Sequence, residues 1–360
     1  MKVGVVVPCY RQERFLPRTV RALEVALADR EWRGVLVLAA PRAAPPGGSD
    51  PLPELSPHWQ VIAPADPQPG PGAAAAGAQA GATAVAGPAS PRPLTPGAAR
   101  MLGLAACGGA WVLFVDADVE VERAWLDAAI AAAERARDGR LAGLWGRIEE
   151  WFVSAQGERP GSPDLYRVGR AERAVDYLAT LAFYRRDALL EAGGYDARLS
   201  SEEDFELGLR LRAAGGELRA LGALAARHWS APRPSFGELA RRWRTGLCLG
   251  QGQVLRLYFG RPGFAVLLRR QALYLATLAM WALGVAALAA TLAGAGARAL
   301  AAWALLPLLV LALMALRKRS ARLALHALLA WTLNGLGLLV GLFRMPRAIA
   351  PRRAAGEARC

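Results

Sequence analysis

The N-terminal part of the chain alternates short apolar runs with stretches of helical periodicity. The runs that predict buried strands are Lys2–Val7, Gly34–Ala39, Trp59–Ile62, Trp111–Val115 and Leu178–Tyr184. Apolar residues at helical spacing predict helices over Phe15–Ala28, Gly97–Ala106, Ala124–Arg137 and Ser201–Ala214. Because strands alternate with helices, the pattern predicts an α/β domain built on a mostly parallel sheet.

Three segments near the C-terminus are apolar on all sides. They are Ala272–Ala293, Ala299–Leu316 and Leu323–Phe343, and none carries an acidic residue, a lysine or an arginine. Each is close to the roughly 20 residues that a helix needs to cross the hydrocarbon core of a bilayer. A core helix of a soluble protein is rarely apolar all round for that length. We therefore expect two to three transmembrane helices within residues 271–343.

Composition divides the remainder of the chain. Ala63–Pro96 consists almost entirely of Ala, Gly and Pro, so it has few large side chains to offset the entropy of ordering. We expect a flexible low-complexity loop there, over residues 63–96, inside a folded domain that spans residues 1–234. A basic amphipathic or interfacial region over 235–270 and a basic tail over 344–360 would flank the transmembrane helices.

The 235–270 region interleaves basic and aromatic side chains. Its arginines are Arg241, Arg242, Arg244, Arg256, Arg261, Arg269 and Arg270, and among them lie Trp243, Tyr258 and Phe259. Such a pattern suits helices at a membrane surface. An ordinary amphipathic helix packed on the folded domain is the alternative interpretation.

The positions of the arginines also bear on orientation. Arg269, Arg270 and the basic cluster Arg317–Arg322 belong in the cytoplasm by the positive-inside rule. A third full crossing would then export the arginines between Arg344 and Arg353. Either the rule fails here, or the last segment is re-entrant or interfacial, and Asn334–Gly337 would suit an interrupted helix.

The 360-residue chain has a formal net charge of +14, carried almost entirely by arginine. Such a surface attracts lipid headgroups, nucleotide phosphates or nucleic acid. No nucleic-acid motif is present, so we expect a membrane and no nucleic acid among the partners. The four cysteines are scattered, which fits a reducing compartment, and the first strand follows Met1 too closely for a signal peptide. These features predict a multi-pass inner-membrane protein with its folded domain in the cytoplasm.

Two acidic residues directly follow an apolar strand. Asp116 and Asp118 come after Trp111–Val115, and ligands of parallel α/β sheets bind at the carboxyl ends of strands. Carboxylates at i and i+2 of a strand end point the same way and can share a divalent cation, Mg²⁺ or Mn²⁺. The cation would stabilise negative charge on a departing nucleoside diphosphate. Two solvated aspartates in a surface loop are the alternative.

A second acidic group, Glu203 and Asp204, follows Ser200 and Ser201 at the start of a predicted helix. A serine at the N-cap and acids in the first turn would explain it structurally. The functional alternative is a general base that removes the proton of an attacking hydroxyl group.

Four motifs in a fixed order resemble those of family 2 glycosyltransferases and cover about residues 3–229. They are Val5-Val6-Val7-Pro8-Cys9-Tyr10-x-x-Glu13-x-x-Leu16; Ala99-Arg100-x-x-Gly103 with Trp111–Asp118; Phe183-x-Arg185-Arg186 with Gly193-Gly194-Tyr195-Asp196; and Glu203-Asp204 with Leu209-Arg210-Leu211 and Gly215.

This resemblance implies a GT-A fold, a nucleotide-sugar donor, a divalent metal and inversion at the anomeric carbon. It implies that Asp116 and Asp118, the DxD motif, hold donor and metal, and that Asp204 is the base with Glu203 beside it. Pro8, Tyr10 and Glu13 would line the nucleotide pocket, with Arg100 near it. His228 falls where related enzymes often place a histidine that faces the metal or diphosphate; a structural histidine is the alternative.

The sequence departs from the family pattern at several positions. The family usually ends its second strand with an aspartate that reads the base, whereas this chain has Ala39-Ala40-Pro41, with Asp50 further on. Arg11 and Met101 stand where asparagines are usual. Leu239-x-x-Arg242-Trp243 is similar to the QxxRW motif of processive synthases but lacks the glutamine.

We expect a hexosyltransferase-like enzyme that transfers sugar to a membrane-proximal acceptor, either lipid-linked or a glycan in polysaccharide biosynthesis. The alternative, suggested by the missing second-strand aspartate, is a non-catalytic partner subunit of an envelope-polysaccharide assembly. A nucleotidyltransferase would need a glycine-rich loop after the first strand, and Pro8–Gln12 has no glycine. Three spans leave little room for the enclosed path of a transporter.

Overall fold

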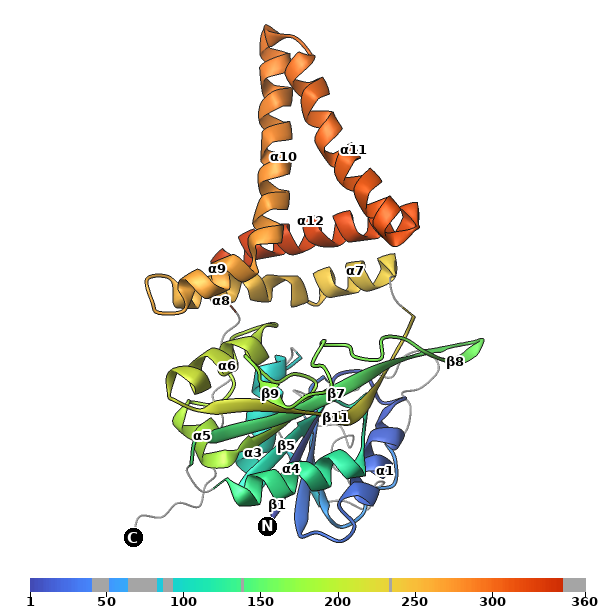
Figure 1. The fold of residues 1–360 in the computed structure, drawn as a ribbon, viewed down its shortest axis with the longest axis vertical. Coiled ribbons are helices and arrows are strands. Elements are labelled where there is room, and N and C mark those ends of the chain that lie inside the picture. Colours follow the sequence, from blue (N-terminus) through green and yellow to red (C-terminus); the bar gives the residue numbers. More distant parts are fainter. Residues whose placement is uncertain (41–51, 64–82, 87–92, 137–138, 233–234, 346–360) are drawn as a thin grey trace. The chain divides into compact units, whose positions relative to one another are not determined.

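A computed structural model describes residues 1–40, 52–63, 83–86, 93–136, 139–232 and 235–345. Internal contacts divide the chain into two compact units. The first contains residues 1–198 and 203–232, and the second contains residues 199–202 and 233–346. Each unit is described by itself below (Figure 1).

The first unit is built on one mixed sheet with the strand order β4-β3-β2-β1-β5-β10-β7-β11-β6. The strands are β1 Val3–Cys9, β2 Trp32–Leu38, β3 Trp59–Ala63, β4 Thr83–Ala86, β5 Trp111–Val115, β6 Val119–Val121, β7 Leu141–Ser154, β8 Gly157–Pro160, β9 Arg173–Ala174, β10 Leu181–Arg185 and β11 Glu217–Ser230. The five strands from β4 to β5 run parallel, while β10 is antiparallel to both of its neighbours. Helix α1, Leu16–Ala26, joins β1 to β2, and helix α3, Pro96–Ala106, precedes β5, so strands and helices alternate there and the α/β prediction is confirmed.

Helices cover this sheet along the first unit. They are α1 Leu16–Ala26, α3 Pro96–Ala106, α4 Arg123–Arg135, α5 Arg186–Glu191 and α6 Glu203–Ala213. Helix α3 packs against β1 and β2, whereas α1 and α4 contact each other and the strands β6, β7 and β11. Strands β1 and β5 lie in the middle of the sheet, and their apolar side chains are fully buried because helices cover both faces.

The parallel register of β1 and β5 positions the functional edge of the sheet. Val3 pairs with Trp111 and Val6 with Phe114, so both strands run in the same direction and end near each other. The chain leaves β5 at Asp116 and leaves β1 toward Gln12. Residues from these two strand ends therefore lie at one edge of the sheet.

Two local expectations differ from the structure. Thr83–Ala86, inside the predicted flexible loop, forms β4 and pairs in parallel with β3. A strand held by main-chain hydrogen bonds at a sheet edge needs no large side chain. The rest of the loop between Ala63 and Leu94 lies outside the described residues or in extended backbone. The strand predicted from Leu178 begins only at Leu181, because Thr180 has a φ of 64° and interrupts the extended backbone.

The two longest strands, β7 and β11, have no counterpart in the predicted elements. They pair with each other in parallel, and their register shifts between Ala220 and Ala226. Gly222 has a φ of 72° at this irregularity. A bulge moves the buried positions from one parity to the other, so no single period of two runs through the strand.

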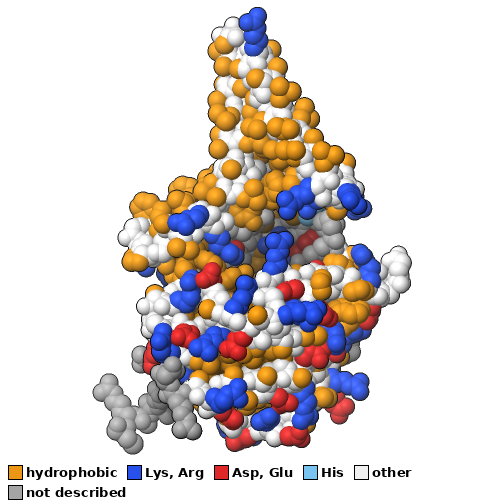
Figure 2. Space-filling view, in the orientation of Figure 1, with side chains coloured by type: hydrophobic (Ala, Val, Ile, Leu, Met, Phe, Trp, Pro, Cys, Tyr) orange, Lys and Arg blue, Asp and Glu red, His pale blue; other side chains and the backbone are white. Residues whose placement is uncertain are grey.

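The second unit is helical. It contains α7 Phe236–Arg244, the short helix η1 Leu247–Leu249, α8 Gly250–Tyr258, α9 Phe264–Arg270, α10 Ala272–Ala290, η2 Thr291–Ala295, α11 Arg298–Lys318 and α12 Ala321–Phe343. Three of these helices are long and apolar enough to cross a membrane, spanning Ala272–Ala295, Arg298–Lys318 and Ala321–Phe343. The prediction of three apolar C-terminal helices is confirmed. Apolar side chains cover the visible surface of α10 and α11 (Figure 2).

The short segment Leu199–Glu202 belongs to the second unit through its contacts. The Ser200 amide donates to Gln253 Oε1 at 2.8 Å, and the Ser201 hydroxyl donates to the Leu247 carbonyl at 2.8 Å. Helix α6 begins at Glu203, and the residue before it is Glu202, with a φ of 68°. Both serines thus bond residues of the helical unit, and Glu202 directly precedes the helix. The acids expected in the first turn, Glu203 and Asp204, lie there.

Candidate active site

The loop between β5 and β6 carries the acidic pair Asp116 and Asp118. The Asp116 amide donates to the Thr180 carbonyl at 2.9 Å, and the Ala117 carbonyl accepts from the Thr19 hydroxyl at 2.9 Å. Hydrogen bonds to Thr180 and from the Thr19 side chain thus fix the loop at Asp116 and Ala117. The two carboxylates are held at the end of a buried strand rather than in a free surface loop.

Asp118 is the more deeply buried member of the pair, with its side chain 10% exposed. Its Oδ2 atom accepts a hydrogen bond from Gln12 Nε2 and lies 3.4 Å from His228 Nε2. Its Oδ1 atom is buried and has no hydrogen-bond partner among the described residues. A buried carboxylate oxygen without a donor is costly, and a cation is one group that would satisfy it.

Arg100, on α3, joins the two acidic motifs. Its Nη2 atom donates to Asp116 Oδ1 at 2.9 Å, and its Nη1 atom donates to Glu203 Oε1 at 2.7 Å. The side chains of Arg100 and Glu203 are only 6% and 8% exposed. The guanidinium also lies 5.2 Å from the ring centroid of the buried Tyr195. Asp116 and Glu203 are 87 residues apart in the sequence, and both form an ion pair with the same arginine.

The charges of this cluster act on one another. Burial lowers the pKa of the Arg100 guanidinium, but the negative charges of Asp204 and Asp116 outweigh it and leave the pKa well above its usual value. Burial raises the pKa of Asp116 to about 6; Arg100 opposes this shift, and Asp118 adds to it. Asp116 therefore releases its proton at a higher pH than an ordinary aspartate does.

Asp204 follows Glu203 in the first turn of α6. Its negative charge raises the pKa of Arg100 more than any other charge does. It also raises the pKa of Tyr184, where only burial has a larger effect. Asp204 therefore lies in the same electrostatic environment as Arg100. Glu203, in contrast, is held by its ion pair with the arginine.

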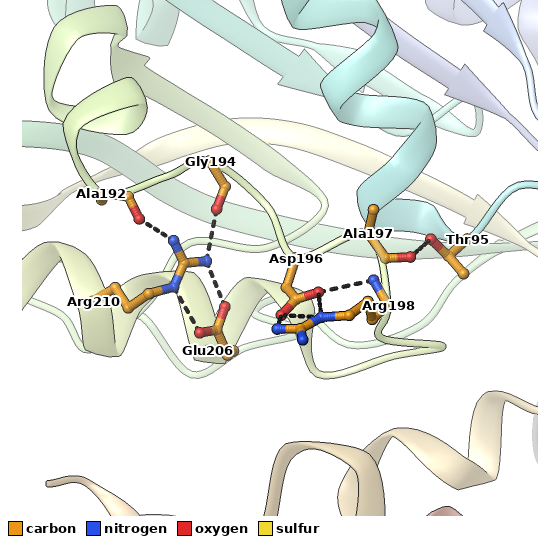
Figure 3. Close-up of polar contacts among 8 residues, drawn as sticks. All are labelled: Thr95, Ala192, Gly194, Asp196, Ala197, Arg198, Glu206 and Arg210. Carbon is orange, nitrogen blue, oxygen red and sulfur yellow. Dashed lines mark hydrogen bonds and ion pairs between the residues drawn. The ribbon is translucent and has the colours of Figure 1, made fainter. Parts of the chain in front are cut away.

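A turn after α5, Gly193–Asp196, is fixed by the side chain of Arg210 (Figure 3). Arg210, on α6, donates to the carbonyls of Ala192 and Gly194 and forms a two-point ion pair with Glu206. The two glycines of the turn have φ values of 83° and 67°, a region that side chains with a Cβ atom disfavour. This explains the Gly-Gly pair of the third motif structurally.

The remainder of that turn is held by its own polar contacts. Asp196 pairs with the guanidinium of Arg198 at 2.7 Å, and the Thr95 hydroxyl donates to the Ala197 carbonyl at 2.7 Å (Figure 3). Thr95 also caps α3, because its hydroxyl accepts from the amide of Ala98. The turn and the helix that carries Arg100 are thereby tied together.

The predicted nucleotide-pocket residues lie at the end of β1. Pro8 is the penultimate residue of this strand, and Tyr10 is half-buried against the core. The Glu13 carbonyl accepts the amide of Leu16 and begins the turn into α1. Arg11 has a φ of 54°, which bends the chain here so that Gln12 reaches Asp118.

The end of the second strand has no acidic side chain among the described residues. β2 ends at Leu38, and Ala39 and Ala40 are buried, with the Ala39 carbonyl accepting from the Leu94 amide. Asp50, the possible substitute, lies outside the described residues. Which residue reads the nucleotide base stays a prediction.

Two residues of the cluster were not singled out from the sequence. Gln12 bonds Asp118, and Tyr195 packs on Arg100. Tyr195 belongs to the quoted Gly-Gly-Tyr-Asp motif, so its position was available as a signal. Gln12 lies between two named pocket residues and carries no signal of its own, because its contact depends on the positive φ of Arg11.

The donor set can be tested for a divalent cation. Among the residues that the structure describes, no group of three His, Cys, Asp or Glu side chains is arranged to hold a metal ion. Mg²⁺ sites in nucleotide enzymes commonly use one or two carboxylates and leave the other positions to phosphate oxygens and water. Asp116 and Asp118, with the unsatisfied Oδ1 of Asp118, fit a site of that kind.

The sequence family that matches this region is described as Glycosyl transferase family 2, and it matches residues 89–193. That range contains Arg100, both aspartates of the acidic pair and the first glycine of the turn after α5. This part of the chain therefore matches a family 2 glycosyltransferase domain. The match supports the expectation of a glycosyltransferase.

A curated relative supports the same assignment of the glycosyltransferase domain. The pre-mycofactocin glycosyltransferase of Mycobacterium tuberculosis is 34% identical over 139 residues, which are 34% of this chain. The match spans 28% of the length of that relative. It therefore concerns the shared domain and leaves the relative's whole activity undecided for this chain.

One solved structure shows the type of fold of this chain. The mannosyltransferase PcManGT from Pyrobaculum calidifontis, in complex with GDP-Man and Mn²⁺, has a TM-score of 0.54 at 20% identity and covers 94% of this chain and 86% of its own. TarS 1–349 of S. aureus, in complex with UDP-GlcNAc, has a TM-score of 0.43 at 16% identity and covers 71% of this chain and 65% of its own. The second similarity is too low to support an argument. The first confirms the expected GT-A type of fold.

Proposed function

We propose that this glycosyltransferase moves a sugar from a nucleotide-sugar donor to a membrane-proximal acceptor, with a divalent metal and with inversion at the anomeric carbon. The observation that carries the proposal is the bridge from Arg100 to Asp116 and Glu203. It brings the acidic pair after β5 and the acidic start of α6 into one cluster. A transferase needs its donor site and the base that deprotonates the acceptor close to each other.

Asp116 and Asp118 would hold the metal, and His228 would face it or the diphosphate from β11. Bound there, the metal would supply positive charge that stabilises the departing nucleoside diphosphate. Gln12 and His228 orient the Asp118 carboxylate by contacting its Oδ2 atom, which leaves Oδ1 for the ligand. Arg100 offsets the repulsion between the carboxylates of Asp116 and Glu203 when no donor is bound.

Asp204 would act as the general base. It would accept the proton of the acceptor hydroxyl as that oxygen forms a bond to the anomeric carbon and the bond from this carbon to the diphosphate oxygen breaks. Glu203 is engaged by Arg100 at 2.7 Å, so its role is to position the arginine and the start of α6. The resemblance to family 2 glycosyltransferases supports Asp204 as the base, and the contact with Arg100 supports a positioning role for Glu203.

Pro8, Tyr10 and Glu13 would line the nucleotide pocket. They lie at the carboxyl end of β1, the strand beside β5, where α/β sheets bind nucleotides. Mannosyltransferase PcManGT was solved with GDP-Man, which supports a nucleotide-sugar ligand for the shared fold. The sugar and base used by this chain are not specified by these residues.

The apolar helices support a membrane location. A chain with the catalytic domain in the cytoplasm and helices in the inner membrane would meet acceptors that are themselves attached to the bilayer, such as lipid-linked sugars or a growing polysaccharide. Tethering raises the effective concentration of such acceptors. It would have no comparable benefit for a freely soluble acceptor.

The test of the proposed chemistry is the pair Asp204→Asn and Glu203→Gln in purified full-length protein. Asp204→Asn should reduce the rate of sugar transfer by about 100-fold or more and leave metal-dependent donor binding intact, because the carboxylate meets the acceptor. Transfer at the wild-type rate by Asp204→Asn would remove Asp204 as the base. Loss of donor binding in this variant would instead place Asp204 in the donor site.

A further inference from the structure

The three long apolar helices of the second unit differ in what they contact. Helices α10 and α11 contact each other, and their outer surfaces are largely exposed. Helix α12 contacts both α10 and α11, but it also packs along η1 and α8 and contacts α7, and it lies across the base of the α10–α11 pair (Figure 1). Its environment therefore includes the amphipathic helices, and it does not run parallel to α10 and α11.

Glycines make the contact between α12 and α8 unusually close. A Cβ atom on Gly252 of α8 would lie 1.9 Å from the Leu338 carbonyl oxygen. Cβ atoms on Gly337 and Gly341 of α12 would lie 2.2 Å and 2.1 Å from the carbonyl oxygens of Cys248 and Leu249. Small residues on both sides let the two backbones touch, as they do where helices pack within membranes. The contact is built into the helices and is not a loose apposition.

Polar contacts connect α12 to the amphipathic helices at both of its ends. Near the start, His326 Nε2 lies 3.3 Å from the Ser235 carbonyl oxygen, at the beginning of α7. Near the end, Arg256 donates to the Leu342 carbonyl at 3.3 Å, and Gln253 donates to the Arg344 carbonyl at 3.0 Å. Helix α12 therefore follows α7 and α8 over its whole length.

The charges of α7 exclude a transmembrane path for this group of helices. Four of the nine residues of α7 are charged: Glu238, Arg241, Arg242 and Arg244. If α12 crossed the bilayer while packed along α7 and α8, these side chains would be carried to the depth of the hydrocarbon. Charged groups are strongly disfavoured there unless they are paired or reach water. A location at the membrane surface satisfies both helices.

The outer face of α12 is apolar. The exposed large side chains of this helix are Leu325, Leu329, Leu336, Leu339 and Phe343. At 3.6 residues per turn they fall on one side of the helix, opposite Gly337 and Gly341, which face η1 and α8. A helix buried on one side by amphipathic helices and apolar on the other suits the boundary between headgroups and acyl chains.

We propose that α12 lies flat in the membrane interface, with its exposed leucines and Phe343 toward the acyl chains, and that only α10 and α11 cross the bilayer. The basic turn from Arg317 to Arg322 and the end of α12 at Arg344 then lie on the same side as α7. This arrangement satisfies the positive-inside rule, which a third crossing violates. The partner of this surface is the lipid bilayer itself, and the proposal does not depend on the transfer reaction.

The first test locates the two ends of α12 with single cysteines in the full-length protein. Ala297→Cys lies between α10 and α11, Ala321→Cys lies at the start of α12, and Arg344→Cys lies at its end. Cys360→Ser removes the native terminal thiol in each variant. A membrane-impermeant maleimide should label positions 321 and 344 from the same side of the membrane, and position 297 from the other.

Labelling of position 344 from the side that labels position 297 would overturn the proposal, because α12 would then cross. If the whole protein were inserted in the opposite orientation, all three positions would change sides. Positions 321 and 344 would still be labelled from one side and position 297 from the other.

Spin labels give a second, independent test of depth. Labels at Leu325, Leu336 and Phe343 of α12 should report one shallow depth, since the helix is parallel to the surface. Labels at Leu305, Leu309 and Leu313 of α11 are the matched control and should report a depth that changes along the helix. A depth that also changes steadily along α12 would contradict a flat orientation.

Discussion

The Arg100 guanidinium donates a 2.7 Å hydrogen bond to the Glu203 carboxylate, and both side chains are almost completely buried. The same guanidinium bonds Asp116. One arginine thus connects the helix that precedes β5, the acidic pair that follows it and the acidic start of α6. Removal of this single cation would leave several carboxylates facing one another.

The first prediction concerns that removal. Arg100→Gln should lower the free energy of unfolding by about 3 kcal/mol, because breaking a buried ion pair from one side leaves an uncompensated charge. It should also weaken donor binding. Thermal unfolding in detergent measures the first effect. Arg30→Gln, which removes a half-exposed ion pair with Asp127, is the control and should cost about 1 kcal/mol or less.

Combining Arg100→Gln with Glu203→Gln should recover part of the lost stability, since the second change removes a carboxylate that the first leaves unpaired. Strict additivity of the two losses would show that the residues do not act as a pair.

The second prediction separates the two neighbouring acids of α6. Asp204→Asn should reduce the transfer rate by about 100-fold or more, the usual contribution of a positioned base. Glu203→Gln should instead reduce stability and donor binding, because its carboxylate holds Arg100. Steady-state rates and donor titrations on both variants distinguish the roles. Equal rates and equal stabilities for the two variants would contradict the division.

The third prediction is a pH dependence of metal binding in the absence of donor. Burial raises the pKa of Asp116 to about 6, so below that pH the carboxyl is protonated and a cation must displace the proton. The Mn²⁺ affinity should therefore rise by about tenfold per pH unit up to about pH 6 and then level off. A titration of Mn²⁺ binding from about pH 5 to about pH 8 measures it. A flat profile throughout would mean that Asp116 is not a ligand.

The fourth prediction concerns the turn after α5. Arg210→Lys keeps a positive charge near Glu206 but loses the planar fork that donates to the carbonyls of Ala192 and Gly194. It should destabilise the domain by about 2 kcal/mol, since two carbonyls lose their donors. Arg212→Lys, in a more exposed ion pair with Asp176, is the matched control and should have little effect. Similar unfolding temperatures for both variants would exclude the proposed role of Arg210.

Local patterns predicted much of the central fold. β1, β2, β3 and β5 were predicted from short apolar runs, because strands buried on both faces contain little else. The long strands β7 and β11 were not, because a bulge breaks their alternation. The composition around Thr83–Ala86 predicts a loop, because an edge strand held by its main chain needs no distinctive side chains.

The candidate site divides in a similar way. Asp116, Asp118, Glu203 and Asp204 stand out in the sequence because acids after a buried strand or at a helix start form a local pattern. Their connection through Arg100 does not, since it depends on how α3 and α6 pack. The contact of Gln12 with Asp118 depends on a left-handed residue, Arg11, where no glycine marks the turn.

The course of α12 was left open by the sequence for a physical reason. Hydrophobicity over 23 residues satisfies both a transmembrane helix and a helix buried on one side against its neighbours. The glycines that bring α12 against α8 decide between the two only once their partners are known.

The central claim is that the acidic pair after β5 holds a nucleotide-sugar through a divalent metal. The most direct measurement is binding of a panel of nucleotide-sugars to detergent-purified full-length protein, with and without Mn²⁺. Asp118→Asn is the test variant, and Asp127→Asn, an exposed acid on α4, is the control. We predict that the wild type and Asp127→Asn bind one donor only with metal and that Asp118→Asn binds none. Failure of the folded wild type to bind any donor, or metal-independent binding equal in all three proteins, would contradict the account and favour a non-catalytic partner subunit.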